Sequence, residues 1–290
     1  EWSMIDNLSR GRVGIAFASG WHFNDFVFFP DHYERRHQVL RDNLDTVRAL
    51  WRGESREFIA GNGAPVSIRT RPDPVQPELP VWITAAASPD TFRYAGSIGA
   101  NVLTHLLGQS LDELAEKIAL YRRTRAEHGH DPEAGRVTLM LHTYVGASRT
   151  QVIDTVREPF KAYLRSSVNL LRPVAEANGM DPDVDQEVLV EAGFQRYFGS
   201  SALFGTPESC LPMIAELERI GVDEAACLLD FGIDPDVVVD GFAHLKRLAD
   251  LARAERARDR MLARRDYRAP EELIAAHGVS HMQCTPSFLR

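Results

Sequence analysis

The chain has 290 residues, of which 44% are hydrophobic and 26% charged, and its formal net charge is -8 at neutral pH. This balance is typical of a globular protein with room for one large domain or two smaller ones, and it argues against broad affinity for nucleic acid. No apolar run is long enough to span a bilayer and no secretory signal is visible, so we expect a cytoplasmic protein that does not contact a membrane.

Five segments share one pattern, in which a short apolar strand is followed by a polar turn and a helix. Five such units favour a parallel sheet or barrel, whose functional groups collect where the strands end. The strands are expected at residues 13–18, 81–84, 101–105, 136–145 and 225–230.

The region between the first two strands mixes helix, hairpin and loop signals. Asp31 is expected to cap a helix that ends near Trp51, before Gly53. The sequence Gly61-Asn62-Gly63 predicts the turn of a hairpin. The prolines of residues 71–80 predict an extended loop, because proline lacks an amide donor and disfavours helix.

Three later helices begin with clear start signals. Ser88 precedes Pro89, Ser110 precedes Glu113 by three residues, and Thr206 precedes another proline. Residues 150–178 and 186–198 are predicted to form helices in a long insertion before the last strand.

Cysteine and arginine usage adds two smaller expectations. Cys210, Cys227 and Cys284 are widely spaced, which predicts reduced, mostly buried thiols and no zinc site. The arginine-rich residues 253–268 are expected to form a solvated helix or a linker.

Three stretches together resemble the bacterial luciferase-like, FMN-dependent monooxygenases: residues 6–21, 99–109 and 221–232. More narrowly, they resemble the natural-product subgroup that is built into nonribosomal peptide and polyketide synthases. The resemblance covers residues 1–250 and implies a TIM-type (β/α)8 barrel with a helical insertion before the last strand. Set against a full barrel, the chain would begin before the fourth strand, which would leave two open sheet edges. The resemblance does not decide whether this stretch is active by itself.

A second resemblance concerns the end of the chain. Residues 270–287 are similar to a stretch of the adenylation domains of nonribosomal synthetases. The two resemblances imply a monooxygenase domain at residues 1–251, a charged linker at 252–268 and the start of an adenylation segment at 269–290.

The resemblances also imply a reaction and a set of partners. Reduced FMN would come from a separate flavin reductase and would react with O2. The substrate would be an aminoacyl or acyl group on a carrier protein, hydroxylated at the α-carbon first and at nitrogen second. The adenylation domain of the same synthetase would be a further partner, and a homodimer is left open.

The resemblance implies six candidate contacts to the flavin phosphate: four residues match the family's positions, and two adjacent arginines lie near its phosphate-binding arginine. Helix starts supply the amides and hydroxyls that a phosphate requires. A plain helix cap, packing of the tryptophan at the mouth of the barrel and surface ion pairs of the arginines are the alternatives. The six residues are Ser88, Thr91, Gly20, Trp21, Arg35 and Arg36.

Oxygen-activating flavin chemistry also needs a water-poor pocket and a proton donor or base. His105 and His142 end strands, His22 follows the Gly20-Trp21 turn, and Asp230 closes the last strand, so these four are the catalytic candidates. Hydrogen-bonded packing of the histidines, and capping of the next turn by Asp230, are the alternatives. No metal-ligand motif is present.

Two rival functions stay open. A deazaflavin (F420)-dependent oxidoreductase could use the same barrel, because phosphate recognition hardly separates the two cofactors. A catalytically silent insert could space or dock synthetase domains, although a spacer has no need of the anion cradle at Ser88 and Thr91.

Overall fold

The computed structural model describes residues 1–20, 22–86, 88–166 and 186–263. Their centre is a parallel sheet with the order β1-β4-β5-β6-β7, in which β8 also pairs with β6. The five predicted strands are confirmed, and the short β7 is an addition that the sequence did not predict. The strands are β1 (Ile15–Phe17), β4 (Val81–Thr84), β5 (Asn101–His105), β6 (Val137–Val145), β7 (Leu203–Gly205) and β8 (Glu224–Leu228).

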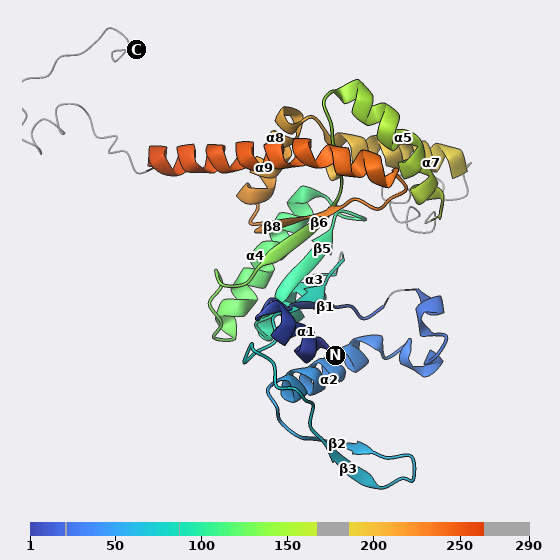
Figure 1. Ribbon diagram of the computed structural model, residues 1–290, viewed down its shortest axis with the longest axis vertical. Helices are drawn as coiled ribbons and strands as arrows, with labels where there is room; N and C mark the ends of the chain where they lie inside the picture. Colours follow the sequence, from blue (N-terminus) through green and yellow to red (C-terminus); the bar gives the residue numbers. More distant parts are fainter. Residues whose placement is uncertain (21, 87, 167–185, 264–290) are drawn as a thin grey trace, which may run out of the picture.

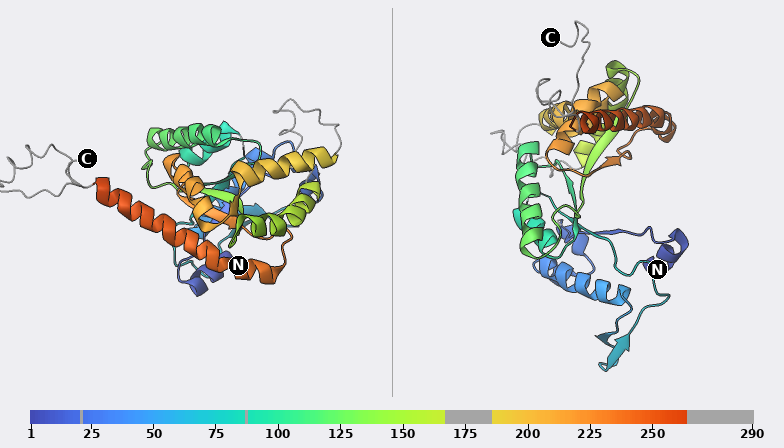
Figure 2. Two further views of the ribbon diagram at one scale, coloured as in Figure 1. Left: turned by 90° about the horizontal axis from the view of Figure 1, so that it is seen from above. Right: turned by 90° about the vertical axis from the view of Figure 1, so that its left-hand side faces the viewer.

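Along the long axis of the molecule, helices lie beyond both ends of this sheet. Figure 1 shows α5, α7, α8 and α9 grouped at the top, with α2 and the β2–β3 hairpin at the bottom. The views of Figure 2 show that α9 extends beyond the sheet as a long rod. The helices are α1 (Trp2–Ser9), α2 (Arg36–Trp51), α3 (Pro89–Ser97), α4 (Leu111–Glu127), α5 (Arg149–Ser166), α7 (Gln186–Arg196), α8 (Pro207–Arg219) and α9 (Pro235–Ala263).

The alternation of side chains along β4 and β5 assigns their two faces. Val81, Ile83 and Val102 are buried in the main core, which the helices cover. Trp82 and Leu103 alternate with them and are half-buried on the opposite face. This second face corresponds to the inside of a barrel, so the side chains that it presents at the strand ends line the mouth.

Local start signals decide where several helices begin. Ser110 and Glu113 form a reciprocal capping box at the start of α4, and Thr206 and Ser209 form another at the start of α8. Pro207 occupies the first turn of α8, as predicted.

The hairpin prediction is also confirmed. Strands β2 (Arg56–Ile59) and β3 (Pro65–Ile68) pair in antiparallel fashion around the Gly61-Asn62-Gly63 turn. In Figure 1 this ribbon projects from the bottom of the molecule, away from the parallel sheet.

The structure corrects two local expectations. Asp31 does not cap a long helix: it lies in a 3-10 turn, Pro30–His32, and α2 begins only at Arg36. Pro30 starts that turn, and the backbone at Arg35 is not helical. Cys227 is exposed because alternate residues of the edge strand β8 face outward, whereas Cys210 is buried as expected.

The far end of the chain modifies the proposed domain boundaries. Helix α9 continues without a break through residue 252 to Ala263, so the first part of the expected linker is helical. Residues 264–290, which include Cys284 and the stretch similar to an adenylation domain, lie outside the described residues, as do 167–185 of the insertion. No helix in the described ranges is long and apolar enough to cross a membrane.

Three strands of the sheet have a single neighbour. Among the described residues, β1 pairs only with β4, and β7 and β8 each pair only with β6. An unpaired strand edge presents backbone donors and acceptors to its surroundings. The expectation of two open edges in a truncated barrel stays a prediction.

Candidate active site

The carboxyl ends of β5, β6 and β8 bring two histidines to one face of the sheet. His105 ends β5 and lies opposite Met140 of β6, while His142 lies two residues further along β6, opposite Leu228. Because alternate residues of a strand share a face, His105 and His142 both face the inside of the barrel-like sheet. The register therefore places these two candidates on the same face of neighbouring strands.

The imidazole of His142 lies inside a cluster of aromatic rings that the insertion helps to build. Its side chain is only 5% exposed. Its Nε2 is buried and has no hydrogen-bond partner among the described residues. Helix α5, the π-helical turn Tyr197–Ser201 and the loop after β8 contribute the rings. They are Phe160, Tyr163, Tyr197 and Phe231, with ring centroids 4.9, 5.0, 5.4 and 5.7 Å from that of His142.

This environment keeps the ionisable groups of the mouth uncharged. Burial, together with the neighbouring His105, lowers the pKa of His142 to about 4, and Asp230 opposes this shift. Burial also raises the pKa of Tyr197 to about 12. His142 and Tyr197 are therefore neutral at pH 7, as expected for groups removed from water.

The backbone of its own loop orients His105. Its Nδ1 accepts a hydrogen bond from the amide of Leu107 at 3.1 Å. Burial lowers the pKa of His105, so the neutral ring is favoured at pH 7.

Asp230 follows β8 by two residues and is exposed. Its charge acts on His142, and burial together with this charge raises the pKa of Tyr163, which places Asp230 close to the aromatic cluster. Among the described hydrogen bonds, none joins the Asp230 carboxylate to the turn before Gly232. Asp230 is thus the acidic group beside His142.

The first turn of α3 carries the expected phosphate residues. Ser88 has the extended backbone of an N-cap residue, with φ -74° and ψ 118°, and it is exposed. Its hydroxyl nevertheless caps none of the helix amides. The amide of Thr91 bonds only the carbonyl of Ser88, at 3.2 Å. The helix start thus presents a hydroxyl that is not used for capping.

Two contacts align α2 with α3. The guanidinium of Arg41 stacks over the ring of Tyr94 at 4.7 Å, and Arg48 donates to the carbonyl of Ile98 at 3.2 Å. These two side-chain contacts hold α2 against α3.

The two candidate arginines lie at the start of α2. Arg36 donates to the carbonyl of Tyr33 at 2.9 Å and lies over its ring, so its guanidinium is already engaged. Arg35 is exposed at the residue before α2 and forms no ion pair in the described part of the chain. Of the two, Arg35 is therefore better able to contact an anion.

The structure explains Gly20 and His22 by local contacts. Gly20 has φ +76°, and a Cβ there would lie 2.7 Å from the ring of Phe26. His22 precedes the 3-10 turn Phe23–Phe26, where its Nδ1 accepts the amide of Asn24 at 3.2 Å. Trp21 lies outside the described residues.

The segment between β1 and α2 carries His22. In Figure 1 the ribbon between β1 and α2 stands to one side of the sheet, apart from the ends of β5 and β6. The segment between β1 and α2 therefore lies away from the ends of β5 and β6.

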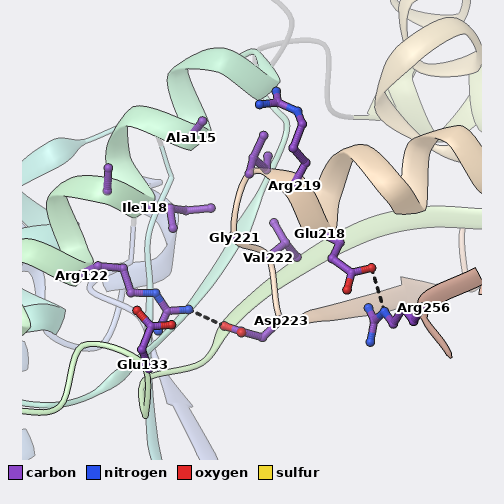
Figure 3. A pocket seen from close by; sticks show the side chains of 12 residues that line it. Ala115, Ile118, Arg122, Glu133, Glu218, Arg219, Gly221, Val222, Asp223 and Arg256 are labelled. Carbon is purple, nitrogen blue, oxygen red and sulfur yellow. Dashed lines mark hydrogen bonds and ion pairs between the residues drawn. The ribbon is translucent and has the colours of Figure 1, made fainter. Parts of the chain in front are cut away.

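A separate open hollow lies at the opposite ends of the parallel strands. Figure 3 shows it between α4, the turn before β8 and α9, where Arg122 pairs with Asp223 and Arg256 pairs with Glu218, both at 2.8 Å. Asp223 precedes β8 and accepts the amide that opens β6 at Val137. This hollow therefore lies at the amino ends of the strands, away from the mouth.

Comparison with known proteins decides the family. Residues 1–224 match the family described as luciferase-like monooxygenase. The chain belongs to this family. Its parallel strands with covering helices are those of the luciferase-like (β/α)8 fold.

Relatives of the luciferase-like family give the scale of the similarity. The oxygenase component of a flavin-dependent trigonelline monooxygenase from Acinetobacter baylyi is 24% identical over 245 residues, which are 80% of this chain and 65% of that protein. The chain thus spans slightly less than two thirds of this relative's length.

Two solved structures share the fold of this luciferase-like chain. The oxygenating constituent of 3,6-diketocamphane monooxygenase from Pseudomonas putida, in complex with FMN, superposes with a TM-score of 0.63 at 17% identity, covering 85% of this chain and 71% of that one. An F420-dependent secondary alcohol dehydrogenase superposes with a TM-score of 0.60 at 16% identity, covering 85% and 72%.

Sequence reasoning missed the groups that surround the two histidines of this luciferase-like chain. The aromatic cluster comes from segments far apart in sequence, and only the helical spacing of the buried Val152, Val156 and Phe160 could have indicated that α5 packs inward. Gln109 was also missed. Its side chain is buried, whereas glutamine side chains are usually exposed. Among the described residues no group of side chains could hold a metal ion.

Proposed function

We propose that the protein is a flavin-dependent monooxygenase that uses reduced FMN, delivered by a separate flavin reductase, and O2 to add one oxygen atom to an organic substrate. The family membership of residues 1–224 supports this proposal. So do the flavin-dependent oxygenase component among its relatives and the FMN complex among its structural neighbours.

The uncommitted hydroxyl of Ser88 carries the proposal. A phosphate dianion is bound well by a helix start that offers backbone amides and a hydroxyl. Ser88 has the backbone of an N-cap residue but leaves the amides of α3 uncapped. The one carboxylate of this turn, Asp90, is held by Arg93 at 2.5 Å, so its charge is balanced. The residues present therefore fit the group.

Under this proposal some of the other candidates bind the phosphate, and His22 belongs to the catalytic group. Thr91 shares the helix start with Ser88, and Gly20, Trp21 and one of the arginines, Arg35 before Arg36, complete the phosphate contacts. His22 caps a local turn and is the weakest of the catalytic candidates.

The bound reduced flavin would supply the activation of O2. The aromatic cluster around His142 would exclude water, since its rings bury the imidazole. His142 would hold or release a proton at Nε2, the atom that has no partner among the described residues. Asp230 would orient a basic group of the substrate beside it.

For the substrate we propose an aminoacyl or acyl group on a carrier protein, hydroxylated at the α-carbon, with nitrogen as the second choice. The support is the similarity of residues 270–287 to an adenylation domain, which lies outside the described residues. Residues 1–251 would then form the oxygenase domain within a nonribosomal synthetase. Mass spectrometry of a loaded carrier protein, after reaction under labelled O2, tests this choice. Label found only in free acids would contradict it.

A titration of the full-length protein with FMN and with F420 tests the cofactor. We expect saturable quenching of FMN fluorescence that weakens about tenfold in Ser88→Ala, the effect of one lost charge-assisted hydrogen bond. Ser110→Ala is the matched control, because that hydroxyl caps α4 and is already used. Equal weakening by both variants would reject the Ser88 site.

The second candidate function is an F420-dependent oxidoreductase, which the superposition on the alcohol dehydrogenase favours. Saturable binding of F420 without binding of FMN would select it. Binding of neither cofactor by the folded full-length protein would favour the silent insert.

A further inference from the structure

The loop between β5 and α4 contains an unusual buried amide. Gln109 is only 2% exposed, and both ends of its side chain are hydrogen-bonded. Its Nε2 donates to the carbonyl of His105 at 2.5 Å and to Oγ1 of Thr104 at 3.1 Å. Its Oε1 accepts from Nζ of Lys117 in α4 at 2.9 Å. The amide thus ties the last two residues of β5 to the following helix.

The same loop is held from the side of the insertion. Arg196, at the end of α7, donates to the carbonyls of Leu106 at 3.4 Å and Gln109 at 3.2 Å. Leu107 packs against the aromatic core that surrounds His142. The backbone of residues 105–109 is therefore held between α4 and the insertion, and it cannot shift without breaking several of these contacts.

This clamp decides which nitrogen of His105 carries the proton. A backbone amide can only donate, so the Nδ1 that accepts from Leu107 at 3.1 Å must present a lone pair. In the neutral ring the single proton then lies on Nε2. Burial favours the neutral ring by lowering the pKa of His105.

We propose that Gln109 is a positioning residue that holds the loop so that His105 keeps its proton on Nε2 and donates a hydrogen bond to a ligand acceptor, such as a carbonyl oxygen, in the mouth of the strands. The proposal rests on the proposed function and deepens it. It assigns His105 the role of donor rather than general base, because its second nitrogen is already used by the loop.

The charged and titratable groups around His105 agree with a donor. His142 on the adjacent strand is neutral at pH 7, and its pKa is lowered partly by His105. Asp230 lies beyond β8, exposed at the other side of His142. Lys117 and Arg196 approach the loop through Gln109 and the loop carbonyls. None of the described hydrogen bonds joins His105 to a carboxylate that would draw the proton to Nδ1.

Nitrogen NMR of the full-length, ligand-free protein tests the tautomer directly. With histidine labelled at both ring nitrogens, we expect the shifts of His105 to show a protonated Nε2 and an unprotonated Nδ1. A dominant Nδ1-protonated form would overturn the proposal. Because no flavin is present, this result does not depend on whether FMN binds, so it fails separately from the proposed function.

The role of Gln109 is tested by Gln109→Glu, with Lys117→Met as the matched control. The carboxylate keeps the contact to Lys117 but cannot donate to His105, whereas the control removes only the contact to α4. We expect hydrogen exchange of the Leu107 amide to become roughly five- to tenfold faster in Gln109→Glu, the effect of about one lost hydrogen bond. The His105 shifts should move toward a tautomer mixture, and Lys117→Met should change both readouts much less.

Unchanged exchange and shifts in folded Gln109→Glu would overturn the positioning role. Should that variant fail to fold, the tautomer of the unmodified protein still decides the donor assignment. Separate additions of FMN and of the substrate then identify the acceptor, since only the ligand that accepts from Nε2 should shift that nitrogen. If neither ligand shifts it in a protein that binds both, the donor role is wrong.

Discussion

The rings of His142 and Phe160 meet in a T-shaped contact, with centroids 4.9 Å apart and planes inclined by 75°. His142 comes from a strand of the sheet, and Phe160 comes from a helix of the insertion. Phe160 also contacts Tyr197 and Phe231 at 5.1 and 5.5 Å. The insertion is therefore part of the wall of the candidate site, and the stability of one depends on the other.

The burial of neutral His142 predicts a pH dependence of stability. Its pKa falls from the ordinary 6.5 to about 4 in the folded chain, so below pH 6.5 the unfolded state binds a proton that the folded state does not. The stabilisation that comes from keeping this ring neutral is complete above pH 6.5. The free energy of unfolding then decreases progressively as the pH falls towards 4. We expect a loss of about 3 kcal/mol over this range.

Urea unfolding of the full-length protein between pH 4 and 7 measures this effect. The variant His142→Phe keeps an aromatic ring in the cluster but has no titrating group, so it is the control for the carboxylates that titrate in the same range. Parallel pH curves for the two proteins would show that His142 is not buried as a neutral ring.

Truncation of Phe160 should destabilise the site and the insertion together. Its side chain is fully buried among rings from β6, α7, the π-helical turn, β7 and the loop after β8. We expect Phe160→Ala to lower the free energy of unfolding by about 3 to 5 kcal/mol, through lost burial and the cavity that remains. Phe28→Ala is the control, because that ring is 86% exposed, and it should change stability by less than about 0.5 kcal/mol. Similar losses in both variants would contradict the packing.

Two serines at helix starts should respond differently to the same change. Ser110 accepts the amide of Glu113 at 3.2 Å, so Ser110→Ala should cost about 1 kcal/mol of stability. Ser88 caps no amide, so Ser88→Ala should cost less than about 0.5 kcal/mol in the absence of a ligand. Thermal unfolding measures both values, and a larger loss for Ser88 would show that its hydroxyl is a cap after all.

Gly20 should be less replaceable than another glycine of similar backbone. At Gly20 a Cβ would lie 2.7 Å from the Phe26 ring, whereas at Gly129, with φ +77°, nothing lies within 4 Å. Gly129→Ala should cost the backbone strain alone, about 1 kcal/mol, and Gly20→Ala should cost about 1 to 3 kcal/mol more. Chemical denaturation compares the two, and equal losses would mean that the Phe26 contact has no energetic weight.

Much of the architecture could be predicted because its signals are local. The Ser110-Glu113 capping box, the proline after Thr206 and the glycine turn of the hairpin each act within a few residues, and the structure confirms all three. Short signals failed where backbone context overrides them, as at Asp31, which lies in a 3-10 turn. The three-residue β7 was missed because so short a strand has no readable alternation.

The sequence by itself determined the parallel strand-helix order, the family and the strand-end position of His105. The expectation that His142 also ends a strand is wrong, because β6 continues for three residues to Val145. Only the tertiary structure decided what surrounds the two histidines: the aromatic wall of His142 and the clamp of Gln109 on the loop of His105. The physical reason is the separation along the chain between the groups that interact. Caps and alternation depend on neighbours in the chain, whereas burial, pKa and tautomer depend on groups that folding brings together from distant segments.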